Sequence, residues 1–99
     1  MVPTAKFSEA DLKRLYWHSR RGMLELDLLL VPFAQGQLKL MNHAMLLKYE
    51  ALLAQEDQDL FSWFTQRISP PDAQLQEIVS LVLAHNAAMG ANPAHHYPA

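Results

Sequence analysis

Residues 19–27, which read SRRGMLELD, place two arginines, a glycine and two acids beside a long apolar run. A guanidinium can bind a carboxylate through two parallel hydrogen bonds, and a glycine lets another backbone approach closely. Glu25 and Asp27 resemble a general acid and base, but side chains two residues apart on a helix point to different sides. The chemistry that this stretch favours is therefore recognition and not catalysis.

Histidines are the other residues with chemical potential. His95 and His96 are adjacent near the C-terminus, where they cannot converge with other ligands without a cost in ordering the chain. His18, His43 and His85 fall on separate expected helices with no regular spacing. The sequence contains no P-loop, dinucleotide fingerprint or nucleophile motif. We therefore expect no metal site and no enzymatic activity.

The composition is that of a small folded domain. The chain has 99 residues, of which 51% are hydrophobic and 18% charged, and this suffices for one core. Its formal net charge of -2 provides no basic field, so nucleic acid is not an expected partner. The lack of cysteine excludes disulfides and suits a reducing compartment. No signal peptide is recognisable, and residues 28–34, the longest apolar run, are too few to span a membrane, so we expect a cytoplasmic protein without membrane insertion.

The charged stretch lies at an expected junction between two helices. Ser8 is followed by acids, which is typical of a helix start, and predicts a first helix over residues 8–19. Gly22 can adopt the left-handed conformation at little cost, and the two arginines before it suit the negative end of a helix. We therefore expect Gly22 to stop the first helix.

The next segment is the most apolar of the chain. Residues 23–33 predict a buried helix; a buried strand is the alternative, and we prefer the helix because no partner strand is visible. Pro32 and Gly36 are expected to kink or end this helix. Asn42 is the expected cap of a third helix over residues 42–55.

Two more helices complete the pattern. Asp57 or Asp59 is expected to cap a fourth helix over residues 60–68. Its expected stripe is Leu60, Phe64 and Ile68. Ser69, followed by two prolines and an acid, predicts the cap of a fifth helix that Gly90 ends. The fifth helix has the clearest periodicity, at Leu75, Ile78, Val79, Val82 and Leu83.

These elements predict an all-α fold, a compact five-helix bundle in a single domain. Residues 8–90 form the expected domain, and residues 1–7 precede it as an N-terminal extension. Residues 91–99 are small, proline-bearing and unpatterned, which predicts a disordered tail.

Several motifs together resemble the small flavin assembly factors of succinate dehydrogenase, the bacterial SdhE type. The central motif is RGxxE, at residues 21–25, and the similarity extends over residues 12–89. The motif alone is weak evidence, but the residues around it make the resemblance fairly strong. These residues are Arg14, Trp17, Arg20, Met23, Asp27, Pro32, Phe33, the segment YEALL at residues 49–53 and the segment DQDLFSWF at residues 57–64.

The resemblance implies a five-helix domain that binds the flavoprotein subunit of succinate dehydrogenase and, in bacteria, also that of fumarate reductase. It implies that the factor promotes covalent attachment of FAD to a histidine of that subunit. The attachment is largely autocatalytic in the flavoprotein, so the factor is expected to hold no cofactor stably and to catalyse no step itself. We expect the free protein to be a monomer.

The residues of the motif can be carried over one by one. Arg21, Gly22 and Glu25 match the RGxxE positions that contact the flavoprotein, and the flanking positions are Trp17, Arg20 and Asp27. We expect Arg21 to protrude from the corner between the first two helices, and Glu25 to lie in the first turn of the second helix. Leu24 and Leu26 are expected to begin its buried side.

Two other functions remain open at this point. One is an antitoxin-like module that neutralises a small membrane-associated toxin, a role also proposed for some relatives of the family. The other is a plain helical adaptor in which the charged junction is purely structural. Near-complete burial of Arg21 and Glu25 against their own chain would favour the adaptor.

Overall fold

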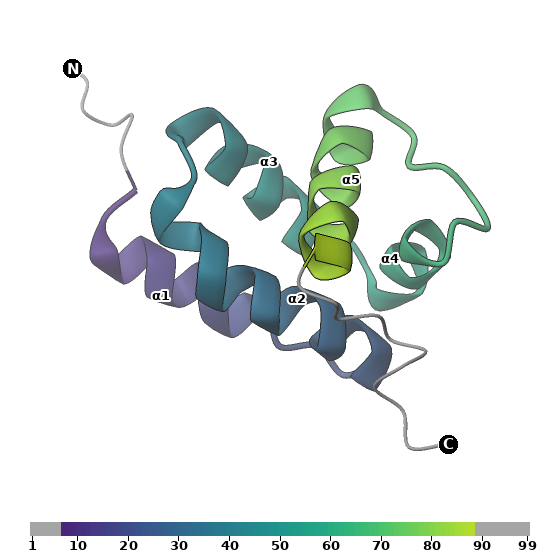
Figure 1. The fold of residues 1–99 in the computed structure, drawn as a ribbon, viewed down its shortest axis with the longest axis horizontal. Coiled ribbons are helices and arrows are strands. Elements are labelled where there is room, and N and C mark those ends of the chain that lie inside the picture. The colour runs from purple at the N-terminus through teal and green to yellow at the C-terminus, as the bar shows by residue number, and fades with distance from the viewer. Residues whose placement is uncertain (1–6, 89–99) are drawn as a thin grey trace.

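A computed structural model describes residues 7–88, which form five α-helices and no strand (Figure 1). The helices are α1 (Glu9–His18), α2 (Leu24–Gln37), α3 (His43–Leu53), α4 (Asp57–Phe64) and α5 (Ala73–Ala88), and the 3-10 turn η2 (Leu38–Leu40) follows α2. The all-α prediction is confirmed, and the apolar run after the charged stretch is a helix and not a strand.

The helices enclose one core. In Figure 1, α1 and α2 lie along the lower part of the molecule and α3, α5 and α4 lie above them. Helix α5 packs against α2, α3 and α4, and α1 packs against α2 and α3. The completely buried side chains of the core include Leu15, Leu26, Leu30, Phe33, Tyr49, Leu52, Leu60, Ile78 and Val82. Every helix therefore contributes to the core.

Helix α1 begins as predicted but ends differently. The Ser8 hydroxyl accepts a hydrogen bond from the Asp11 backbone N–H at 3.1 Å, and the Asp11 carboxylate accepts one from the Ser8 N–H at 2.9 Å. The helix ends at His18, and Ser19 caps it in a right-handed conformation. The backbone of Gly22 lies outside the left-handed region, so the prediction that Gly22 stops the helix in that conformation is wrong.

Helix α2 is longer than the sequence suggests. It continues through Pro32 and Gly36 to Gln37, so neither residue ends it. The proline removes one backbone donor, but the buried side chains around it, such as Phe33, hold the helix in place. At Gly36 a Cβ atom would lie 3.4 Å from Nε2 of His85 on α5. Gly36 therefore lies beside the His85 side chain, where a Cβ atom would make a close but ordinary contact.

Helix α3 follows the prediction and α4 does not. The side chain of Asn42 caps α3 by accepting a hydrogen bond from the Met45 N–H at 2.8 Å. Helix α4 begins at Asp57, and its cap Glu56 makes no side-chain hydrogen bond there. The prediction that Asp57 or Asp59 caps α4 is wrong, because Asp57 is the first residue of the helix and its carboxylate binds Arg21.

Helix α4 also ends earlier than expected. Its last residue is Phe64, and Gln66 has a φ of 62°, the left-handed conformation that turns the chain. Ile68 is therefore not part of the buried stripe, and 61% of it is exposed.

The cap of α5 is Asp72 and not Ser69. The Asp72 carboxylate accepts a hydrogen bond from the Leu75 N–H at 2.8 Å. Pro71 disfavours helical geometry at Pro70, which would be the first helical residue if Ser69 were the cap, and the observed helix begins at Ala73. The predicted stop at Gly90, the tail at residues 91–99 and residues 1–6 lie outside the described residues.

Candidate functional site

The charged stretch forms the connection between α1 and α2. We call residues 17–25, the last turn of α1, the connection and the first turn of α2, the α1–α2 corner. Its side chains divide into two groups. Arg21 is directed inward, whereas the exposed group consists of Trp17, His18, Arg20, Gly22 and Leu24.

The guanidinium of Arg21 is bound by its own chain. Its Nε donates to Oδ1 of Asp57 at 2.7 Å. Nη1 donates to the carbonyl oxygens of Leu53 at 2.9 Å and His18 at 3.2 Å, and Nη2 donates to that of Gln55 at 2.8 Å. Only 15% of the Arg21 side chain is exposed. The expectation that Arg21 protrudes is therefore wrong.

The carbonyl groups explain why the arginine turns inward. Leu53 ends α3 and Gln55 follows its cap, so these oxygens lie at the negative end of that helix, where no intrahelical donor remains. A guanidinium satisfies several such carbonyls together. Arg21 therefore caps α3 from the α1–α2 corner and also pairs with α4.

Two further contacts hold the backbone of the corner. A side-chain oxygen of Asp27 accepts a hydrogen bond from the backbone N–H of Arg21. The Ser19 hydroxyl donates to the Leu15 carbonyl at 2.9 Å and shares a hydrogen bond with the Tyr49 hydroxyl. Burial raises the pKa of Tyr49, although the Ser19 hydrogen bond and the charge of Arg21 oppose this rise. The corner is thus fixed from α2 and α3.

The outward side of the corner is open to solvent. Trp17 is 62% exposed and Leu24 is 61% exposed, so the expectation that Leu24 begins the buried side of the helix is wrong. The Arg20 guanidinium lies 5.7 Å from the centroid of the Trp17 ring. Gly22, which lies between Arg20 and Leu24 in the sequence, is also exposed. An exposed tryptophan, a cation and an aliphatic side chain are typical of a protein-binding surface.

The two acids of the corner have separate positions. Glu25 lies in the first turn of α2, as predicted, where a carboxylate is favoured by the helix dipole. Among the described residues its carboxylate makes no salt bridge, and the residue is half-buried. Asp27 is directed to the Arg21 backbone. The structure therefore does not bring the two carboxylates together as an acid and base pair.

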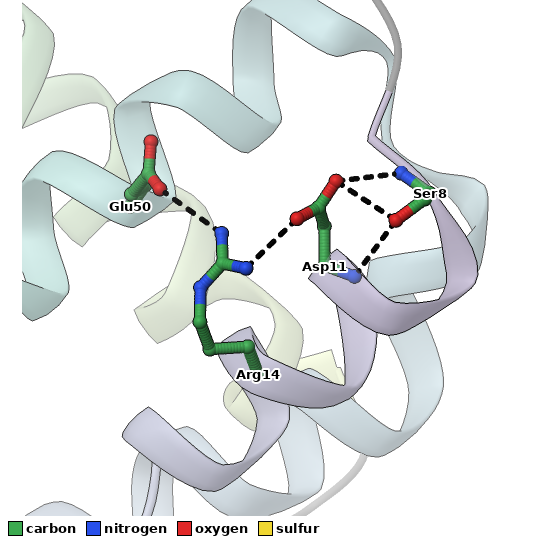
Figure 2. A network of polar contacts seen from close by, with 4 residues as sticks. All are labelled: Ser8, Asp11, Arg14 and Glu50. Carbon is green, nitrogen blue, oxygen red and sulfur yellow. Dashed lines mark hydrogen bonds and ion pairs between the residues drawn. The ribbon is translucent and has the colours of Figure 1, made fainter.

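A second polar network lies at the other end of α1 (Figure 2). The Asp11 carboxylate accepts hydrogen bonds from Ser8 and from Arg14, the latter at 2.8 Å, and Arg14 reaches Glu50 on α3 at 3.6 Å. The Ser8 backbone N–H, followed by the Arg14 guanidinium and the Ser8 hydroxyl, lowers the pKa of Asp11 to about 2. This network joins α1 to α3 at the surface.

Other features of the described residues do not offer a competing site. A hollow of about 280 Å³ lies between α5 and the loop before it, and none of the predicted site residues lines it. Within residues 7–88 no group of three or more His, Asp or Glu side chains is arranged to hold a metal ion. No helix in the same range has the length and apolar character that crossing a membrane requires.

Two features of this site were not predicted from the sequence, namely the pairing of Asp57 with Arg21 and the exposure of Leu24. Asp57 lies 36 positions from Arg21, and the sequence predicts it only as a possible helix cap. The signal available was its place in the segment DQDLFSWF, which pointed to the family but not to Arg21. The sequence does not indicate that Leu24 is exposed, because Leu24 stands in an apolar run and resembles its buried neighbours.

The fold defines a small all-helical domain with an exposed corner between its first two helices. Comparison with known proteins then identifies its family. Residues 13–86 match the family model described as the flavinator of succinate dehydrogenase. The chain therefore belongs to this family.

Named relatives align in sequence with this chain over most of their own length. A protein of Pseudomonas aeruginosa named FAD assembly factor SdhE is 53% identical over 75 residues, which cover 76% of this chain and 89% of the relative. Proteins of the same name from Mannheimia succiniciproducens and Pectobacterium atrosepticum are 41% and 35% identical, and the alignments cover 77% and 83% of this chain and 88% and 94% of those relatives. None of these names supports the antitoxin alternative.

Proposed function

We propose that this protein is an assembly factor that binds the flavoprotein subunit of succinate dehydrogenase and promotes covalent attachment of FAD to it. The single observation that carries the proposal is membership of the flavinator family over residues 13–86. Relatives with up to 53% identity bear the name FAD assembly factor. The flavoprotein of fumarate reductase is a second proposed partner.

The outward side of the α1–α2 corner is the proposed contact surface. Trp17 and Leu24 supply large apolar groups, and Arg20 supplies a cation for an acidic group of the flavoprotein. A Cβ atom at Gly22 would have an ordinary contact of 3.6 Å with Asp57, so the fold does not require a glycine there. We infer that Gly22 serves the close approach of the partner.

Glu25 and Asp27 have different proposed roles in this surface. Glu25 makes no salt bridge among the described residues and is open to a cationic group of the partner. Asp27 is occupied by the Arg21 backbone and supports the surface from behind. We do not favour the plain adaptor, in which the whole charged junction is structural. A structural role explains the inward position of Arg21, but it does not explain the exposed residues of the corner.

The proposed mechanism is selection of a conformation and not catalysis. A factor that binds best to the flavoprotein conformation in which FAD and its histidine are ready to react increases the population of that conformation. The bond then forms within the flavoprotein. In this proposal the factor acts as a monomer and binds FAD only through its partner. It works in the cytoplasm, a reducing compartment that suits a chain without cysteine.

Co-expression with the flavoprotein subunit tests the proposal. Covalent flavin is read as in-gel fluorescence of the denatured subunit, with and without the factor. We expect strong fluorescence with the wild-type chain and a loss of about tenfold or more with Trp17→Ala, because buried tryptophans often dominate an interface. Leu40→Ala is the matched control, since Leu40 is 76% exposed on η2, beyond the opposite end of α2.

Two results would contradict the proposal. One is equal covalent flavin with and without the wild-type chain. The other is an equal loss in the Trp17→Ala and Leu40→Ala proteins, which would show that the corner has no special role.

A further inference from the structure

We propose that Arg21 of the RGxxE motif is a positioning residue that acts through Asp57, and that it is not a contact residue for the partner. The proposal rests on the proposed function. It assigns Asp57, outside the motif, to the same functional unit. The direct contacts then fall to the outward side of the α1–α2 corner.

The hydrogen bonds of Arg21 leave few donors free for a partner. A guanidinium has five N–H groups, and forked recognition of a carboxylate needs two of them on one edge. Four hydrogen bonds already leave this guanidinium, to Asp57 and to the carbonyls of His18, Leu53 and Gln55. At most one N–H remains, so Arg21 cannot bind a partner carboxylate in a fork without breaking bonds inside the fold.

Asp57 lies next to the RG pair of the motif. Its Oδ1 accepts the hydrogen bond from Arg21 Nε at 2.7 Å. Its Oδ2 lies 3.6 Å from the point where a Cβ atom of Gly22 would be. The carboxylate therefore binds Arg21 and lies beside the position of Gly22, so it links this part of the motif to α4.

The α1–α2 corner is held by contacts with three helices. Arg21 binds the C-terminal carbonyls of α3 and the first residue of α4, while Asp27 on α2 binds its backbone N–H. A connection of this length would otherwise sample many conformations, and binding would have to order it. With these bonds in place, Trp17, Arg20 and Leu24 are presented in one arrangement before the partner arrives.

The experiment is a double-mutant cycle on the purified chain. Arg21→Ala, Asp57→Ala and the double variant are titrated with the purified flavoprotein subunit, and the Gly22 amide resonance of the free chain is recorded by NMR. Each single variant is expected to weaken binding by about tenfold, because each breaks the same charged hydrogen bond. The double variant is expected to be no weaker than the weaker single one.

A loss of binding caused by partial unfolding must be distinguished from a loss caused by a displaced contact surface. All titrations are made well below the melting temperature of the weakest variant, and Glu77→Gln is the matched control because the Lys48–Glu77 pair joins α3 to α5 at 2.6 Å, away from the corner. Glu77→Gln is expected to leave binding and the Gly22 resonance unchanged. If Arg21→Ala does not fold, Arg21→Lys and Asp57→Asn replace the single variants, because they retain most of the side-chain volume.

The outcomes separate this inference from the proposed function. A shifted Gly22 resonance in the free variants together with non-additive losses supports the positioning role. Full binding by Asp57→Ala, or a double variant whose losses add, would show that Arg21 contacts the partner directly and would overturn the inference alone. A wild-type chain that neither binds the flavoprotein nor raises its covalent flavin would overturn the proposed function and this inference with it.

Discussion

Arg14 and Arg21 are two arginines of the same region with different surroundings. Arg14 lies on α1 with 48% of its side chain exposed, and its partners are Asp11, one turn away, and Glu50 at 3.6 Å. Arg21 lies in the corner with 15% of its side chain exposed, and it binds Asp57 and the end of α3. Residue type alone therefore does not separate a surface charge from a structural one.

The two arginines differ in what their partners would lose if the guanidinium were removed. Exposed ion pairs contribute little, because water solvates both partners well and salt screens them. The carbonyls bound by Arg21 lie at a helix end, and removing the guanidinium leaves them and Asp57 without their donor. We therefore expect the two networks to respond very differently to mutation.

The largest effect is expected at Arg21. Arg21→Ala should lower the free energy of unfolding by about 2–4 kcal/mol, since several partly buried hydrogen bonds to a charged group are lost together. Urea denaturation followed by circular dichroism measures the change. A loss comparable to that of an exposed ion pair would show that the inward network is not structural.

A pH-dependent effect is expected at Asp11. Its folded-state pKa is lowered to about 2 from an ordinary value of 3.8, so its contribution to stability is complete above about pH 4 and is lost as the pH falls toward 2. The difference in stability between the wild-type and Asp11→Asn chains should therefore shrink over this range. Denaturant midpoints measured from pH 6 to pH 2 test it, and a difference that stays constant to pH 2 would contradict the low pKa.

The smallest effect is expected at Glu50. Glu50→Gln removes the longer contact of Arg14 and should change the free energy of unfolding by less than about 0.5 kcal/mol. The same urea experiment applies, in low and in high salt. A loss that approaches that of Arg21→Ala would remove the distinction between the two arginines.

The sequence predicted the parts of the fold that depend on near neighbours. Ser8 and Asn42 cap α1 and α3 as expected, because a cap joins residues three positions apart. The buried positions of α5 at Leu75, Ile78, Val79 and Val82 also follow from helical periodicity.

The missed features depend on distant residues. Asp57 could act as a helix cap or as the partner of Arg21, and only the folded chain brings the end of α3 and the start of α4 to the corner. Gly22 resembled a left-handed stop because glycine tolerates that conformation, yet its backbone does not use it. For Asp57, a tertiary contact with Arg21 determines its role.

The most direct test of the binding surface uses one position. A Cβ atom at Gly22 would make only an ordinary contact of 3.6 Å with Asp57, and the residue is exposed, so we expect Gly22→Ala to melt like the wild-type chain and Gly22→Arg to fold with its side chain directed to solvent. Titration of each into purified flavoprotein subunit, after melting curves confirm the fold, is expected to give affinities that fall from wild type to Ala to Arg. The Arg variant should lose about a hundredfold or more, because its side chain occupies the space of the partner. Wild-type affinity in a folded Gly22→Arg chain would show that the α1–α2 corner is not the contact surface.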